Sequence, residues 1–483
     1  MIEKNNATSS VSNSFYKPIL QRLLYNLDTE TIEENRNEER IIQVCRDNKI
    51  KFTDPTFPPN LNSLLKRDSG SETLLWENVF WMRISDLFQF YEFELFKELS
   101  PLNLNQGLLS NGYFVEALSI LIETPELIKN LFSSSHPSEY GVYAINLFIN
   151  GKWSRILIDD HIPVIEAKDG GVKPAFSSSV ISGEAWVLLL EKAYAKAYGS
   201  YQRINSGDPI HFLRELTGAP YARITPIISQ AAFLQKISGV INKGWILTAK
   251  SANSTLEIQE GMTYTILSID RENKEISLRN PWSPALKNQD GIFSLKFYEF
   301  AKNFTEIGVC MVQPKFKSFG IVIDQSEIQK SLVMMEIKEN LEITVSLDQF
   351  DLRSRKEFSY DYFRLSMCRI SDEELQFIDC ILSDAKTLFI SETLPQGKYL
   401  ILIEGFWRQK PNKCTLNIYT SSRPKLTLLQ LTHNIFKLIE YLMWKNFTEN
   451  NQEVFTKIDK KEIFSKKIDK IAFLEKFSFF LIF

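Results

Sequence analysis

The sequence is poor in the residues that build metal centres and disulfide frameworks. Its 483 residues include five cysteines and four histidines, and no two cysteines form a CxxC pair. An odd number of dispersed cysteines argues against a disulfide scaffold, and zinc sites need clustered Cys and His ligands. We therefore expect free, buried thiols in a reducing compartment. The cysteines are Cys45, Cys310, Cys368, Cys380 and Cys414.

Long apolar runs and an excess of positive charge are also missing. No stretch of 18 apolar residues occurs, so we expect no membrane-spanning helix. The first fifteen residues lack the apolar core of a secretory signal, which favours a cytoplasmic protein. Lys and Arg number 56 against 59 Asp and Glu, a net charge of −3. This balance argues against a nucleic-acid partner, which would need a basic face.

Hydrophobic periodicity divides the chain into a helical part and a strand-rich part. A helix is expected to start near Asn111, and a second one over residues 184–199 has apolar side chains at helical spacing and ends at Gly199. Past Thr217 the pattern changes to short strands, and past Pro314 to closely spaced strands typical of a sandwich.

Two segments stand out as candidates for carrying chemistry. The first, QGLLSNGYF, runs from Gln106 to Phe114 at a predicted helix start, and the second is GMTYTI over residues 261–266. Positions 262 and 280 are symmetric about a predicted turn, so we expect them to face each other across a hairpin, as a general base and its orienting amide would. A nucleophile at the helix start would complete a Cys-His-Asn arrangement.

These segments resemble the calpains, cysteine proteases with a papain-like core in two lobes and a β-sandwich behind it. The family pattern QGxLGDCWFLAALSxL reads QGLLSNGYFVEALSIL here, a GHAYSV-like strand reads GMTYTI, and RNPWG reads RNPWS. Four further segments are similar to family segments and follow in the same order: FTDPTFPPN, GKWSRILIDDHIPV, EAWVLLLEKAYAKAYGSY and LPQGKYLILIEGF. The resemblance covers about residues 51–421.

The resemblance implies an α+β fold with a two-lobed papain-like calpain core followed by an all-β sandwich, and the sequence beyond it indicates a helical C-terminal tail. The tail has a stripe of apolar residues from Leu428 and ends in FSFFLIF. It is expected either to dock a partner or the sandwich as an amphipathic helix, or to be a weakly ordered extension; contact with a membrane surface has no support in the sequence. The implied segments are a polar lead-in (1–45), the first lobe (46–217), the second lobe (218–316), the sandwich (317–421) and the tail (422–483).

The resemblance fails at the residues that carry the family's chemistry. Gly112 stands at the nucleophilic Cys position and Met262 at the general-base His position. Glycine has no side chain to attack a carbonyl, and a thioether is a weak acceptor that cannot shuttle a proton. The matching residues that remain are Asn280 of the triad, Gln106 at the oxyanion position and Trp282, the shield of the His–Asn pair.

Other side chains are poor substitutes for the missing pair. Ser110 precedes the vacant position by two residues and is expected to cap or turn the chain at the helix start. His161 is expected on the surface at a strand end, and Cys310 as a thiol in the core. A rescue of catalysis by any of them would need a rearranged fold.

Calcium is the one cofactor that the resemblance implies. Glu184 matches a first-lobe ligand of the family, whereas Asn103 stands where the family has an acidic residue. Asp290 is the single match to the family's acidic second-lobe loop. Calcium prefers several oxygen ligands with carboxylate charge, so we expect its binding to be weakened or lost.

Three hypotheses about function follow. The preferred one is a catalytically inactive pseudopeptidase that binds a protein or peptide as a scaffold or regulator. The alternative is an intracellular calcium-dependent cysteine endopeptidase that carries out limited proteolysis, which requires a nucleophile and base absent from the motifs. The third is a partner or regulator of a genuine calpain.

Overall fold

The computed structural model places two compact units along the chain. One contains residues 31–149 and 153–314, and the other contains residues 1–30, 150–152 and 315–483. The predicted lead-in before residue 38, most of the tail, Trp282 and Asp290 lie outside the described residues. These are residues 38–65, 76, 78–225, 230–281, 291–325, 330–350, 360–371, 374–408 and 413–429.

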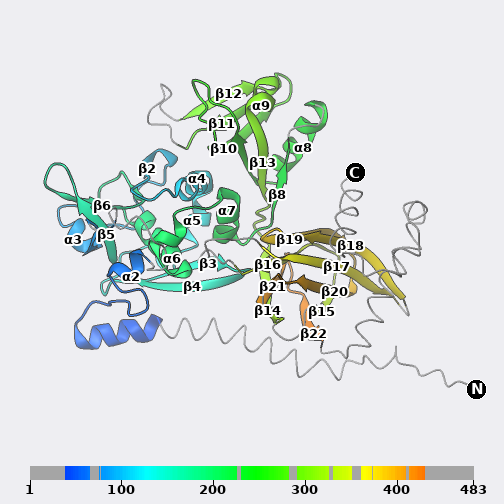
Figure 1. Cartoon of the computed structure of the whole chain (residues 1–483), viewed down its shortest axis with the longest axis horizontal. Helices are drawn as coiled ribbons and strands as arrows, with labels where there is room; N and C mark the ends of the chain where they lie inside the picture. Colours follow the sequence, from blue (N-terminus) through cyan, green and yellow to red (C-terminus); the bar gives the residue numbers. More distant parts are fainter. Residues whose placement is uncertain are drawn as a thin grey trace, which may run out of the picture. The chain divides into compact units, whose positions relative to one another are not determined.

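Helices α4, α6 and α7 lie in the region that precedes residue 218 (Figure 1). α4 (Gly112–Leu121) is buried from Tyr113 to its end, and α6 (Trp186–Tyr198) ends at Gly199, whose φ of 94° suits a residue without a Cβ. Both helices were predicted and are confirmed. α7 (Pro209–Thr217) packs against α4 through stacked aromatic rings. Shorter helices are α2 (Leu61–Leu64), α3 (Ile84–Leu87), η2 (Pro101–Asn103), α5 (Pro125–Lys129) and η3 (Tyr201–Ile204), and residues 38–48 are also helical.

Small sheets flank these helices. A turn at Asn150 and Gly151 joins two strands, and both residues have the positive φ that such a turn requires. The strands are β3 (Val142–Ile149) with β4 (Lys152–Asp159), β1 (Phe80–Arg83) with β5 (His161–Glu166) and β6 (Val172–Pro174), and β2 (Leu104–Asn105) with β7 (Ser178–Ser179).

A buried ion pair anchors α6 to the end of β4. Lys192 is fully buried, and its ammonium donates to the carboxylate of Asp159 and to the backbone carbonyl of His161. Burial alone would raise the pKa of Asp159, but the hydrogen bond to His161 and the charge of Lys192 hold it well below its usual range. The sequence analysis missed this pair, because its two members are 33 residues apart.

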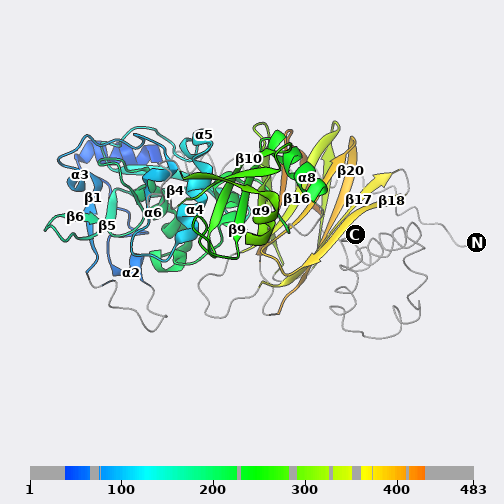
Figure 2. The ribbon, with the colours of Figure 1, turned by 90° about the horizontal axis from the view of Figure 1, so that it is seen from above.

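A six-stranded sheet follows the helical region, in the order β12-β11-β10-β9-β13-β8. Helices α8 (Gln230–Asn242) and α9 (Phe297–Asn303) accompany it (Figure 2), and Phe233 and Phe300 from these helices join its buried core. The strands are β8 (Tyr221–Ile224), β9 (Ile246–Ser251), β10 (Thr263–Asp270), β11 (Glu275–Arg279), β12 (Ile292–Lys296) and β13 (Phe304–Cys310).

The β10–β11 hairpin differs from the predicted register. The turn spans residues 271–274, and Asp270 pairs with Glu275. Near the open end, Thr265 pairs with Arg279 after a bulge. Met262 therefore lies just before β10 and is not directly opposite Asn280. The prediction was wrong because it centred the turn too early in the sequence.

The other unit contains two antiparallel sheets, in the orders β14-β21-β16-β19 and β18-β17-β20-β15-β22. Their inward side chains share one buried apolar cluster, which includes the alternating residues Leu341, Ile343, Val345 and Leu347 of β16. Leu428 lies in β22 and not in a helix, which corrects the predicted start of the helical stripe. The strands are β14 (Lys317–Asp324), β15 (Lys330–Ile337), β16 (Leu341–Gln349), β17 (Tyr362–Ser371), β18 (Glu374–Ser383), β19 (Thr387–Leu394), β20 (Gly397–Phe406), β21 (Lys413–Thr420) and β22 (Lys425–Leu429).

The described part of the chain matches the expectations about membranes and thiols. None of its helices combines the length and apolar character needed to cross a membrane. All five cysteines are free, and four of them are buried. The composition therefore predicted the state of the thiols correctly.

Candidate functional site

Gly112 is the first residue of α4, and Asn111 is the N-cap residue that precedes it. The Asn111 side chain does not cap the helix. It is fully buried, and its Nδ2 donates to the Glu191 carboxylate of α6 at 2.7 Å. Glu191 Oε2 also accepts the backbone N–H of Ser177 at 3.0 Å. One buried carboxyl group thus fixes the start of α4 and the loop before β7.

The Glu191 carboxyl group is unusual because it is buried without a cation on it. Burial raises its pKa to about 7, and hydrogen bonds from Ser177 and Asn111 only partly oppose this. Among the residues that the structure describes, the buried Asn111 Oδ1 has no hydrogen-bond partner. This polar cluster was not predicted from the sequence. The signal for it in the sequence was Glu191, an acidic residue within the apolar pattern of α6.

Gln106 lies in the loop between β2 and α4. Its Nε2 donates to the backbone carbonyl of Leu109 at 2.7 Å, so the amide stabilises its own loop. The next residue, Gly107, passes close to the neighbouring chain: a Cβ there would lie 2.3 Å from the Cα of Phe176 and 2.4 Å from the carbonyl of Ala175. The loop that carries the predicted oxyanion residue therefore requires glycine at 107.

Met262 and Asn280 lie at the open end of the β10–β11 hairpin. Met262 is half-buried and packs against the apolar core of the six-stranded sheet, while its backbone N–H and carbonyl bond to Ser251. Asn280 is buried, and its backbone N–H donates to the carbonyl of Gly291 at 2.9 Å. Helix α4 contacts β9 and β10, which brings the Gly112 helix and the Met262 sheet together.

The residues considered as substitutes for the missing nucleophile and base lack the surroundings that catalysis needs. Cys310 is completely buried beside Thr217, and burial raises its pKa to about 11, so the thiol stays protonated at neutral pH. Ser110 is exposed, and its backbone N–H donates to Asn205. The three described histidines occupy other places: His161 bonds to Asp159, His211 packs on Tyr221, and His136 lies in an exposed loop.

The calcium candidates do not assemble a calcium-type ligand set. Both carboxylate oxygens of Glu184 accept hydrogen bonds from protein donors, and Asn103 donates its amide to the carbonyl of Glu98. Within the described ranges, no three His, Cys, Asp or Glu side chains are grouped to hold a metal. Asp290 lies outside those ranges. The residues that the structure describes therefore do not fit the ion.

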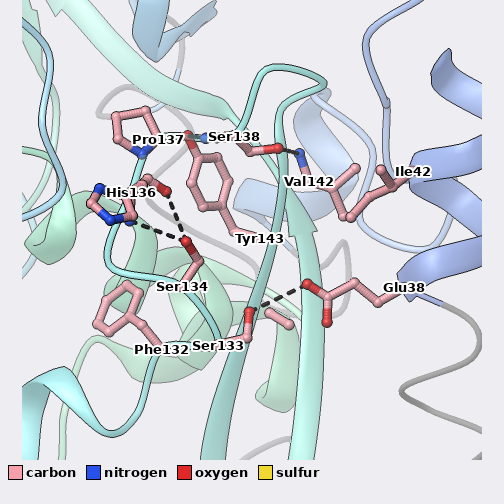
Figure 3. A pocket seen from close by; sticks show the side chains of 11 residues that line it. Glu38, Ile42, Phe132, Ser133, Ser134, His136, Pro137, Ser138, Val142 and Tyr143 are labelled. Atoms are coloured by element: carbon pink, nitrogen blue, oxygen red, sulfur yellow. Dashed lines mark hydrogen bonds between the residues drawn. The ribbon is translucent and has the colours of Figure 1, made fainter.

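A small cavity of about 160 Å³ lies elsewhere, between the helix at 38–48 and the loop before β3 (Figure 3). Its serine hydroxyls are engaged within the protein: Ser133 bonds to Glu38, Ser134 to the backbone of His136, and Ser138 to the N–H of Val142. Arg155 in turn binds the Glu38 carboxylate. These contacts join the helix to the loop and serve packing.

The family model described as calpain family cysteine protease matches residues 52–288, which include α4, the hairpin and Asn280. Residues 52–288 of this chain therefore form a domain of the calpain family. The described chain as a whole has a mixed α and β structure in which strands predominate, and it includes this calpain protease domain. The family expectation drawn from the two motifs is thus confirmed.

Several calpains are similar to this chain over a little more than half of its length. The calpain-type cysteine protease DEK1 of Zea mays is 29% identical over 317 residues, 56% of this chain and 14% of that protein. Calpain-5 of Caenorhabditis elegans is 25% identical over 353 residues, 58% and 53% of the two chains. Calpain-8 of Rattus norvegicus is 25% identical over 327 residues, 57% and 44%.

The chain therefore spans at most about half the length of these relatives. Among solved structures, the Yersinia pseudotuberculosis-derived mitogen aligns with 24% of this chain at 9% identity. Its TM-score of 0.17 is too low to bear on the fold.

Proposed function

We propose that this calpain-family chain is a pseudopeptidase, which binds a protein or peptide and does not cleave it. The observation that supports this is the reading of the two motifs, with Gly112 at the nucleophile position and Met262 at the general-base position. Neither side chain can perform its step. Loss of one member of such a catalytic unit typically lowers kcat by about 10⁴–10⁶-fold.

The local packing favours a maintained binding surface over a decayed one. Asn111 and Glu191 hold the start of α4, and the Gln106 loop is closed by its own hydrogen bond. Asn111 is next to the position where the family's nucleophile stands, and Gln106 lies in the loop that leads to it. These side chains order the segment, while the reacting groups are absent.

The endopeptidase alternative requires a different nucleophile near a base. Cys310 is buried and protonated, and Ser110 has no imidazole among its hydrogen-bond contacts in the described chain. A serine hydroxyl needs an adjacent base to act as a nucleophile. The alternative is therefore the weaker proposal.

The proposed partner is a protein or peptide, including a catalytically competent calpain that this chain would regulate. The proposed location is the cytoplasm, where free thiols such as those of this chain persist. Co-purification of the full chain from its source cell tests the partner. Recovery of no protease would contradict the regulator form of the proposal.

Cleavage of casein by the purified full chain, with calcium and with EGTA, tests catalytic inactivity. We expect no cleavage above background in either buffer. Cleavage that disappears in a Ser110→Ala or Cys310→Ala variant would establish an endopeptidase. The double variant Gly112→Cys/Met262→His provides the matched gain-of-function control.

Fluorescence anisotropy with labelled casein peptides tests binding separately. We expect saturable binding by the unmodified chain. Gly112→Leu should weaken this binding about tenfold, equivalent to about 1.4 kcal/mol, because it places a bulky side chain at the start of α4. Gly239→Leu, at an exposed position of α8, is the control and should bind normally. Equal binding by both variants would place the peptide elsewhere.

A further inference from the structure

Hydrogen bonds between protein groups join the segment around Glu184 to residues 94–104. The Glu184 side chain is 1% exposed, and its Oε1 accepts the backbone N–H groups of Lys97 and Glu98 at 2.7 and 2.9 Å. Its Oε2 accepts the hydroxyl of Ser179 at 2.5 Å. Three donors therefore bind the carboxylate, a number that can satisfy and stabilise its charge.

Asn103 completes the same junction with an uncharged amide. Its side-chain Nδ2 donates to the backbone carbonyl of Glu98 at 3.3 Å. Its backbone carbonyl accepts the backbone N–H of Val180 at 2.8 Å. An amide hydrogen thus binds an oxygen that would otherwise be available to a cation. An aspartate at this position has no such hydrogen to donate.

Lys97 brings a positive charge into the junction. Its ammonium donates to the carbonyl of Ser182 at 3.1 Å, two residues before Glu184. A lysine ammonium is a compact point charge with three donors. It repels a divalent cation electrostatically and binds one of the backbone oxygens of the same loop.

We propose that Lys97, Asn103 and Ser179 replace a calcium ion at the Glu184 junction, so that this part of the calpain domain is ordered without calcium. The proposal does not depend on the pseudopeptidase function, because it concerns the order of the loop and not the reaction. It makes calcium unnecessary for the arrangement of the segment that leads into the Gln106 loop.

Thermal unfolding of the full chain in millimolar calcium and in EGTA tests this proposal. An ion bound at 100 times its Kd would raise Tm by roughly 5–10 °C. We expect that calcium does not raise Tm by binding at Glu184. Calcium should therefore either leave Tm unchanged or change it equally in the unmodified chain and in Glu184→Gln. A calcium shift that is present in the unmodified chain and lost in Glu184→Gln overturns the proposal.

A second variant keeps the test decisive if Glu184→Gln does not fold. Lys97→Met/Asn103→Asp removes the ammonium and restores a carboxylate beside Glu184. We expect its Tm to rise with calcium by several degrees more than that of the unmodified chain, and calcium titration calorimetry should show an additional bound ion. An identical calcium response in the two proteins would overturn the proposal.

Discussion

Arg279, the last residue of β11, forms an ion pair with Glu123, which follows the end of α4, with 2.6 Å between Nε and Oε1. The pair joins the Met262–Asn280 hairpin to the helix that begins at Gly112. Both side chains are partly buried, and burial raises the pKa of Glu123 despite the attraction of Arg279. The arginine therefore offsets the cost of placing a carboxylate between the sheet and the helix.

Arg279→Met should lower the free energy of unfolding by about 1–2 kcal/mol, because it leaves Glu123 half-buried without its cation. Glu123→Gln should cost less, since an amide is not charged. Urea denaturation of both single variants and the double variant measures the coupling between them. Lys296→Met, which breaks the exposed pair with Glu275 on the same sheet, is the control and should change stability by less than about 0.5 kcal/mol. Equal effects of Arg279→Met and Lys296→Met would contradict a special role for the pair.

Glu191 should make the protein less stable as pH rises towards neutrality. Its pKa in the folded state is about 7, above the ordinary glutamate value of 4.5, so folding favours the protonated form. The stabilising contribution is complete below the unfolded-state pKa and is lost as pH rises through 7. Between pH ~5.5 and pH ~8 this group should lower the free energy of unfolding by about 2 kcal/mol.

Comparison with Glu191→Gln isolates this contribution. The variant cannot titrate, so the difference in unfolding free energy between the two proteins should change across this pH range. Asp159, whose pKa is lowered, affects stability only at more acidic pH and leaves the range clear. A difference that is constant from pH ~5.5 to pH ~8 would show that Glu191 remains in one protonation state.

The sequence predicted the elements around the site better than their contacts. Helix α4, helix α6 with its stop at Gly199, and the turn at Asn150 follow from local periodicity and turn chemistry, which neighbouring residues determine. α8 was missed although Phe233, Ile237 and Val240 recur at helical spacing, because the surrounding strands dominated the interpretation.

The contacts within the site depend on residues that are distant in sequence. Asn111 meets Glu191 across 80 residues, and no local pattern links them. The predicted register of the β10–β11 hairpin was wrong by a few positions. Hydrophobic alternation shows neither the length of the turn nor the bulge after Ile266. The resemblance of the motifs located the candidate residues, but only the three-dimensional structure showed which residues they contact.

Lys192→Met should be strongly destabilising. The ammonium is fully buried against Asp159, and removing it leaves an uncompensated buried carboxylate. Loss of one member of a buried pair costs about 3–5 kcal/mol. Chemical denaturation followed by far-UV circular dichroism measures the loss. Lys129→Met, in an exposed pair with Glu126, is the matched control and should be nearly neutral; a comparable loss in both would refute the importance of burial.

Gly107→Ala should disrupt the loop that carries Gln106. The added Cβ would lie 2.3 Å from the Cα of Phe176, and a backbone atom cannot move away as a flexible side chain does. We expect a loss of about 3 kcal/mol or more, with the strain concentrated at the start of α4. Gly239→Ala is the matched control, because a Cβ there meets nothing within 4 Å and alanine favours the α8 helix by about 0.5–1 kcal/mol. In thermal unfolding, Gly107→Ala should lower Tm and Gly239→Ala should raise it slightly. A Gly107→Ala variant with unchanged Tm would show that the Gln106 loop does not need its close approach to Phe176.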